Sequence, residues 1–300
     1  MKKIIVSGVI NIETSLAVKH FPVEYCPIDY NFFGIQTGIS GVGYNVAVAL
    51  KTLGAEPHLL SIVGKDMYRT IIENELKEKQ ISCDLSPLLD TTPQSIVLYD
   101  EEGKRRIYSD LKDIQDKKYP YNEVEQSFLD VDLAVICNIN FSRELLAVMK
   151  EKGICIASDV HVVNDLDDEY NRDFMQAADI LFLSNENIKG REREFLNQLI
   201  NKYNNKIIVI GMGAQGALMY NRESGDISVH EARRTREIIN TVGAGDALFS
   251  AFIFFYSKSG NPYESIENAI YFASYKIGED GGANGFLTEQ ELINLFGNYQ

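Results

Sequence analysis

Residues 240–246 read Asn-Thr-Val-Gly-Ala-Gly-Asp and run directly into the apolar segment 247–256 (ALFSAFIFFY). A helix N-terminus carries unpaired N–H groups and a partial positive charge, and glycine lets the backbone approach an anion without a Cβ in the way. The stretch therefore predicts a phosphate-binding loop at the start of a buried helix. It is not a P-loop, because GxxxxGK[ST] does not occur in the chain.

This loop ends in a carboxylate, Asp246. An aspartate in a first helical turn often only compensates the helix dipole. Beside an anion pocket, however, a carboxylate repels phosphate unless it has a task, and the task available is to accept the proton of an attacking hydroxyl. The residues alone leave both interpretations open.

Outside this stretch, short apolar runs alternate with longer segments of helical periodicity. Near-continuous apolar strands that alternate with helices predict a parallel sheet covered on both faces, and so a three-layer αβα body of the α/β class. The expected strands are 3–6, 58–63, 133–137, 154–157, 180–183 and 206–210, and the expected helices are 42–53, 67–79, 142–152, 245–256 and 263–277.

Two regions break the alternation. Residues 14–38 are rich in strand formers without helical period, and residues 94–110 resemble a hairpin with its turn at 101–103. Alternating segments of this kind suit a small sheet exposed on one face. We therefore expect one domain over residues 1–300 that carries a small β-sheet lid. An exposed apolar face and an open strand edge on that lid predict a homodimer paired through it.

Composition excludes several classes of partner. The 300 residues include 29 basic and 43 acidic side chains, a formal net charge of −14, which argues against nucleic acid or an anionic membrane surface as partner. The four cysteines have no metal-ligand spacing, and no HExxH motif occurs. No apolar run approaches the roughly 18 residues of a membrane span, and no signal-peptide pattern is present. We expect a cytoplasmic protein with no nucleic-acid and no membrane partner.

Five motifs resemble those of the ribokinase-like, or PfkB-type, carbohydrate kinases and follow the family's order along the chain. They are SGVGYN (40–45), VGKD (63–66), the flap hairpin DEEGKR (100–105), the nucleotide-site loop GMGAQGA (211–217) and NTVGAGDALFSAF (240–252). The family form of the first is GGxxxN, and the last contains a stretch whose family form is DTxGAGD. The resemblance implies an enzyme that transfers the γ-phosphoryl group of ATP to an alcohol, with Mg²⁺ bridging the phosphates. Asp246 matches the catalytic base, and the backbone N–H groups of Gly243, Ala244 and Gly245 match the anion hole.

The acceptor site is expected near two polar residues that follow the first strand, Asn11 and Glu13, because polar side chains at the carboxyl end of a strand in an open sheet face a ligand. The family motif ends in Asp where this chain has Glu13. Gly41 and Asn45 match glycine and amide contacts to sugar hydroxyls, and Asn140 matches the position of a further polar sugar contact.

The ATP side is implied more loosely. Asn185 resembles the first residue of an N-x-x-E motif that is linked to Mg²⁺ and phosphate. Gly213 and Gly216 are expected to border the nucleotide, and Ala273 and Ile277 either pack on the adenine or belong to the core.

Three positions depart from the family pattern. Ile188 occupies the glutamate position of N-x-x-E, which leaves the metal ligands unknown, with Glu186 as a weak substitute. Asn240 replaces a carboxylate that in many relatives belongs to a monovalent-cation site, so potassium dependence stays open. Ser40 replaces the first glycine of GGxxxN, and we interpret it as tolerated.

The acceptor itself stays open between two classes. A free sugar is expected, and a nucleoside of the pseudouridine type is the alternative, in which Tyr44, Phe32 and Phe33 would stack on a base; otherwise these rings only close an apolar flap. His161 is expected near the cleft, either at the surface or behind the residues that touch the substrate, and a direct substrate contact is the alternative. A sugar-binding sensor without turnover is the alternative from another class. The phosphorylated hydroxyl is not predicted.

Overall fold

The structure is a computed structural model that describes residues 2–101 and 104–297, so positions 102 and 103 of the expected hairpin turn lie outside the described residues. Its main sheet has the strand order β13-β12-β11-β10-β9-β8-β1-β4-β5. The strands are β1 (Lys3–Ser7), β4 (Glu56–Gly64), β5 (Ser82–Leu89), β8 (Leu133–Ile136), β9 (Cys155–Val162), β10 (Ile180–Ser184), β11 (Ile207–Gly211), β12 (Ala217–Asn221) and β13 (Asp226–His230).

The sheet is parallel from β5 to β11, as its continuous apolar strands predict, and in β1 the side chains of Ile4, Ile5 and Val6 are fully buried. At one edge the parallel sheet is extended by two antiparallel strands that the sequence did not predict. There β12 pairs antiparallel with β11, and β13 pairs antiparallel with β12, because short turns join these strands and no crossover helix intervenes.

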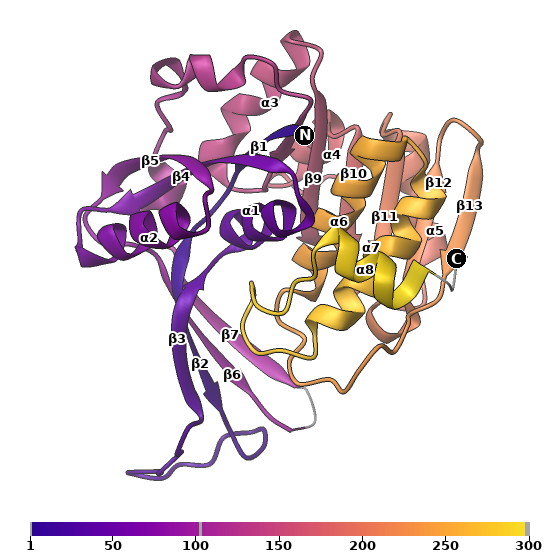
Figure 1. The fold of residues 1–300 in the computed structure, drawn as a ribbon. Coiled ribbons are helices and arrows are strands. Elements are labelled where there is room, and N and C mark those ends of the chain that lie inside the picture. Colours follow the sequence, from indigo (N-terminus) through magenta and orange to yellow (C-terminus); the bar gives the residue numbers. More distant parts are fainter. Residues whose placement is uncertain (1, 102–103, 298–300) are drawn as a thin grey trace.

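Helices cover both faces of the sheet, which confirms the three-layer α/β body (Figure 1). One core cluster forms between the sheet and α1 (Val42–Leu53), α2 (Met67–Glu78), α6 (Ala244–Ser259), α7 (Pro262–Lys276) and α8 (Glu289–Phe296). The other forms against α3 (Arg143–Glu151), α4 (Arg172–Ala177) and α5 (Glu192–Lys202). No helix in the described part of the chain is long and apolar enough to cross a membrane.

A second sheet projects from the body, and we call its four strands the lid (Figure 1). Its order is β3-β2-β6-β7, formed by β2 (Asn11–Ala17), β3 (Ile35–Ser40), β6 (Gln94–Tyr99) and β7 (Arg105–Asp110). Within the lid, β2 begins three residues before the predicted segment 14–38, and β3 ends two residues after it. Asn11 and Glu13 therefore lie on a lid strand and not in a loop after β1, and β2 pairs with β3 in the register Asn11 to Ser40.

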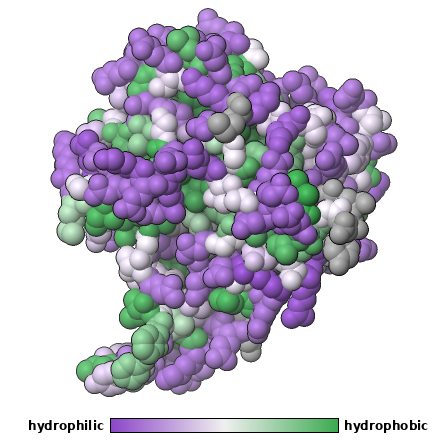
Figure 2. Space-filling model, viewed as in Figure 1, coloured by the Kyte–Doolittle hydropathy of each residue, from purple (hydrophilic) through white to green (hydrophobic). Residues whose placement is uncertain are grey.

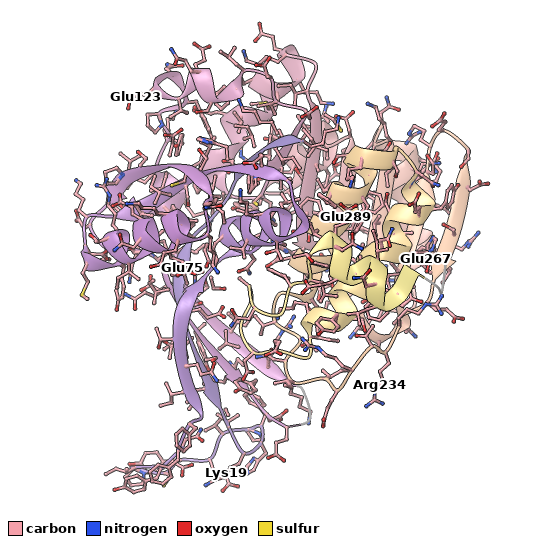
Figure 3. The ribbon with its side chains drawn as sticks, in the orientation of Figure 1. Lys19, Glu75, Glu123, Arg234, Glu267 and Glu289 are labelled. Carbon is pink, nitrogen blue, oxygen red and sulfur yellow. The ribbon has the colours of Figure 1, made fainter. Side chains whose placement is uncertain are left out.

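The far end of the lid exposes apolar side chains, which the space-filling view shows as a green surface below the body (Figure 2). Lys19 marks this end in Figure 3. Phe33 is fully exposed and Phe32 is 80% exposed, so these rings neither close a flap nor reach a ligand in the body. Both interpretations of the two rings that the sequence suggested are thus wrong.

Candidate active site

A cleft with a volume of about 1390 Å³ lies between the lid and the carboxyl ends of the main-sheet strands. Small-molecule sites commonly measure about 300–1,000 Å³, so this cleft has room for two ligands side by side. Its walls include nearly all the residues that the sequence singled out: Asn11, Glu13, Gly41, Asn45, Asn185, Gly213, Gly216, Gly243, Ala244, Gly245, Asp246, Ala273 and Ile277.

The loop before α6 has the geometry of an anion-binding turn. Gly243 is the N-cap and has φ 75°, and a Cβ on it would lie 2.3 Å from the carbonyl oxygen of Gly282, so only glycine fits there. The N–H groups of Gly243 and Gly245 have no hydrogen-bond partner among the described residues, whereas Ala244 donates to Thr241 O at 3.3 Å. The loop therefore offers the free N–H groups of Gly243 and Gly245 to the cleft, together with that of Ala244, whose intramolecular bond is long.

Asp246 lies one residue beyond this loop and is buried at the base of the cleft. Asn45 of α1 donates from Nδ2 to Asp246 Oδ2 at 2.7 Å. Burial raises the pKa of Asp246, and the nearby Asp159 adds to this, while His161, the Asn45 hydrogen bond and Lys276 oppose it. The result is a carboxylate with increased proton affinity beside free backbone donors.

The acceptor side of the cleft is polar. Asn11 donates to Ser95 Oγ at 2.6 Å, and Ser95 in turn donates to Glu13 Oε2 at 3.4 Å. Burial raises the pKa of Glu13, against the opposing hydrogen bonds of Ser40 and Ser95. The buried Oδ1 of Asn45 has no hydrogen-bond partner among the described residues, and an atom of this kind is costly to leave unpaired. The amide thus has a free acceptor that a ligand hydroxyl can satisfy.

Two expected contacts lie elsewhere. Asn140 does not line the cleft, because its amide donates to Gln115 O at 3.1 Å and its oxygen accepts from Arg143 at 3.1 Å. Tyr44, a residue of α1, is buried in the core and donates to Glu75 of α2 at 3.0 Å. Glu75 is labelled on α2 in Figure 3. The expected base stacking by Tyr44 is therefore wrong: adjacent helix positions face different ways, so Asn45 faces the cleft and Tyr44 faces α2.

The nucleotide side has a carboxylate that the motif did not locate. Asn185, after β10, donates to Glu192 Oε1 at 2.8 Å, and this hydrogen bond lowers the pKa of Glu192. Both residues line the cleft, whereas Ile188 is buried. Glu192 was missed because it lies seven positions after Asn185, outside the N-x-x-E spacing. Among the described residues, no group of three or more His, Cys, Asp or Glu side chains is arranged to hold a metal ion.

The nucleotide loop, residues 211–217, requires glycine at one position. Gly216 has φ 92°, and a Cβ on it would lie 1.9 Å from the carbonyl oxygen of His230. Four positively charged side chains also line the cleft. From the sequence they were not singled out, because they belong to no recognisable motif. They are Lys189, Arg233, Arg234 and Arg236.

Three further residues at the site were missed or undervalued. Arg105 reaches from the lid and donates to Thr241 O at 2.8 Å and to Thr241 Oγ1 at 3.1 Å, which joins the lid to the loop before α6. His161 lines the cleft with its Nδ1 3.8 Å from Asp159, and it lies on β9, which continues to Val162 beyond its predicted end at 157–159. Lys276, at the end of α7, is fully buried behind the same loop.

Comparison with known proteins gives the following matches. The family of pfkB carbohydrate kinases matches residues 1–289. The ribokinase of Dictyostelium discoideum is 22% identical over 290 residues, which cover 86% of this chain and 89% of that protein. A solved microbiome-derived acarbose kinase has a TM-score of 0.89 at 19% identity and covers 99% of both chains. The nucleoside kinase of Burkholderia thailandensis, solved with inosine, has a TM-score of 0.78 at 15% identity and covers 99% of this chain and 96% of its own. At these identities, the structural matches show a shared fold.

Proposed function

The chain belongs to the pfkB family of carbohydrate kinases, and from that premise we propose that it transfers the γ-phosphoryl group of ATP to a hydroxyl of a free sugar, with Asp246 as the general base. The family makes the chain a phosphotransferase with an alcohol group as acceptor, and it implies the use of ATP. The observation that carries the finer proposal is the buried Asp246 carboxylate, which lies beside the free N–H groups of Gly243 and Gly245.

The reaction is a direct displacement at phosphorus. The acceptor oxygen bonds to the γ-phosphorus while the bond to the bridging oxygen breaks, ADP leaves, and the hydroxyl proton passes to Asp246. The increased proton affinity of Asp246 suits it to this task. The N–H groups of Gly243 and Gly245, with a contribution from Ala244, stabilise the charge on the transferring oxygens.

Three polar groups orient the acceptor in this proposal. Asn45 accepts a hydroxyl through its unpaired Oδ1, while its Nδ2 holds Asp246. Asn11 and Glu13 bind further hydroxyls from the lid strand β2, and Gly41 leaves room at the start of α1. Amide and carboxylate groups of this kind recognise a polyol, which offers both donors and acceptors.

ATP is assigned to the other half of the cleft. Gly213 and Gly216 border the nucleotide, Ala273 and Ile277 line its apolar side, and Asn185 lies toward the phosphates. Mg²⁺, typical of this family, fits the oxygen donors of Asn185 and Glu192, which would hold it together with the phosphates. When bound, Mg²⁺ offsets phosphate charge.

A nucleoside is the second candidate acceptor, favoured by the fold shared with the inosine-bound nucleoside kinase. The side-chain content of the cleft favours the sugar. Phe182 is the one Phe, Tyr or Trp among the described residues that line the cleft, and it is only 2% exposed, so the imidazole of His161 is the one exposed ring that could stack on a base.

A panel of free sugars, amino sugars and nucleosides, with ADP release as the readout, tests the proposal. We expect the highest kcat/KM with a sugar. A nucleoside with a higher kcat/KM than every sugar would replace the first candidate with the second. Phosphorylation of no acceptor at all, by a protein that still binds ATP, would contradict both.

The exposed end of the lid supports a proposal on how copies of this chain pair. Phe33 and Phe32, with the strand formers around them, give an apolar surface next to the open edge of β3, and we propose that two copies pair through it. The exposed part of the lid is then buried in a homodimer.

A further inference from the structure

Lys276 is the one lysine or arginine among the described residues whose side chain is fully buried. It is the last residue of α7 and lies behind the loop that precedes α6. Burying an ammonium group costs several kcal/mol unless its donors are satisfied. A charge in this position therefore needs compensating contacts.

Backbone oxygens supply those contacts. The Nζ of Lys276 donates to Val242 O and, at 2.5 Å, to Gly281 O. No carboxylate among the described residues forms a direct ion pair with it. The ammonium group is thus surrounded as a small bound cation would be, by carbonyl oxygens from two separate loops.

The contact with Val242 fixes the direction of the next N–H group. In a trans peptide the C=O and N–H point in opposite directions. Because the carbonyl of Val242 points to Lys276, the N–H of Gly243 points to the other side of the loop. That N–H has no hydrogen-bond partner among the described residues.

The contact with Gly281 fixes the loop that supports the site. The next residue, Gly282, packs against Gly243 on one side and against the Asn45 amide on the other: a Cβ on Gly282 would lie 2.7 Å from Asn45 Nδ2. The ammonium group of Lys276 therefore contacts both the anion-binding turn and the loop that packs against Asn45, the hydrogen-bond partner of Asp246.

We propose that Lys276 is a positioning residue, a built-in cation that holds the loop at 241–245 in its phosphoryl-binding conformation and offsets the negative charge of the site. This inference rests on the proposed function. It also implies that the enzyme needs no added monovalent cation, because Lys276 supplies the charge. In support, Asn240 brings no carboxylate to attract such an ion, and its Oδ1 instead accepts from Val242 N at 2.8 Å.

The ionisable groups around Lys276 come from every neighbouring element. They are Asp246 of α6, Glu13 of β2, Asp280 after α7 and Arg105 of β7. Burial lowers the pKa of Lys276 to about 8, while the three carboxylates oppose this and Arg105 adds to it. The ammonium form therefore persists at neutral pH and is lost above about pH 8, and kcat should fall with it.

The test compares K276M, K276A and the control K258M, since Lys258 lies near the end of α6 and pairs with Glu289, labelled in Figure 3, away from the site. With the best acceptor of the panel, we expect K276M to lose about 100-fold or more in kcat, similar to the loss of one oxyanion donor, with smaller changes in KM. K258M should match the parent protein. Ethylamine, ammonium or potassium should restore part of the activity of K276A, and the parent rate should be equal in sodium and potassium.

Retention of more than half the parent kcat by K276M, or a potassium requirement of the parent protein, would overturn the inference while leaving the kinase proposal intact. If neither variant folds, the pH profile of the parent protein decides: a constant kcat from pH 7 to 10 overturns the inference, and a fall near pH 8 supports it. If no acceptor is phosphorylated, the kinase proposal fails separately, and lysine labelled at Cε then tests Lys276 by NMR. One resonance, absent from K276M, should titrate near pH 8; its absence would overturn the inference.

Discussion

The amide of Asn45 donates a 2.7 Å hydrogen bond to the carboxylate of Asp246, across 201 positions of sequence. The bond joins the first turn of α1 to the first turn of α6, so one contact brings the GGxxxN-like and DTxGAGD-like motifs to the same place. Because the Oδ1 of the same amide is unpaired, the bond leaves one atom of Asn45 for a ligand.

Substitution of Asn45 should therefore affect the acceptor and the base together. We expect N45A to lower kcat about 100-fold, since removal of a hydrogen bond to a charged group in a buried site costs about 2–3 kcal/mol, and to raise KM for the acceptor more than KM for ATP. Steady-state kinetics with each substrate varied in turn measures both.

The matched control is Y44F, one residue away. Tyr44 loses only its bond to Glu75, which should cost about 1 kcal/mol of stability and leave both KM values within twofold. A change in acceptor KM as large in Y44F as in N45A would contradict the placement of the two side chains.

Two glycines of the same loop should respond differently to alanine. In G243A the new Cβ would lie 2.3 Å from Gly282 O, and the alanine would have to adopt φ 75°. We therefore expect the free energy of unfolding to fall by about 2 kcal/mol, and most of the activity to be lost. In G245A the Cβ meets nothing within 4 Å. Urea unfolding of both variants measures the difference, and equal destabilisation would contradict the loop geometry.

The pH dependence of stability should carry the signature of Lys276. Its folded-state pKa of about 8 lies below the ordinary value of 10.5, so between these values the unfolded chain holds a proton that the folded chain has released. Folding is then favoured as pH rises through this window. Relative to K276M, the free energy of unfolding of the parent protein should increase by up to about 3 kcal/mol, while its kcat falls.

Urea unfolding of both proteins from pH 7 to 10.5 measures this difference, and the other titrating groups cancel in the comparison. Parallel stability curves for the parent protein and K276M would show that Lys276 does not titrate in this range.

The lid should set the oligomeric state. F33D introduces a charge at a fully exposed ring of the proposed contact surface, so we expect a dimer for the parent protein and a monomer for F33D at micromolar concentration. Light scattering after size-exclusion chromatography measures both, with I293D on the half-exposed face of α8 as the control. A parent protein that is monomeric at this concentration would contradict the proposed interface.

Local pattern was sufficient for much of the fold. The predicted helix 42–53 has the bounds of α1, because apolar spacing and the C-cap Gly54 act within one element. The edge strands β12 and β13 were not predicted. Each has only five residues, and although four residues of β12 are buried and apolar, so short a run does not distinguish a strand from part of a buried helix.

Residues that depend on distant contacts were predicted less well. Asn140 follows β8 as a sugar-binding residue would, but Gln115 and Arg143 engage its amide. A lysine at a helix end ordinarily indicates a favourable interaction with the helix dipole. Lys276 instead turns inward because the loop after α7 folds back over Gly243, and only the tertiary structure reveals that contact.

The central claim is that Asp246 accepts the proton of the acceptor hydroxyl. D246N keeps the shape of the side chain and can still accept the hydrogen bond from Asn45, but it cannot take up the proton. Because burial raises the pKa of Asp246, removing this buried charge should also leave the folded protein at least as stable at pH 7.

The most direct measurement is the turnover of D246N beside the parent protein, with acceptor and ATP binding followed by calorimetry. We predict a loss of about 10³–10⁴-fold in kcat with both binding affinities retained within a few-fold. Equal turnover by the two proteins would contradict the role of Asp246, and binding of a sugar without turnover in either protein would indicate a sensor.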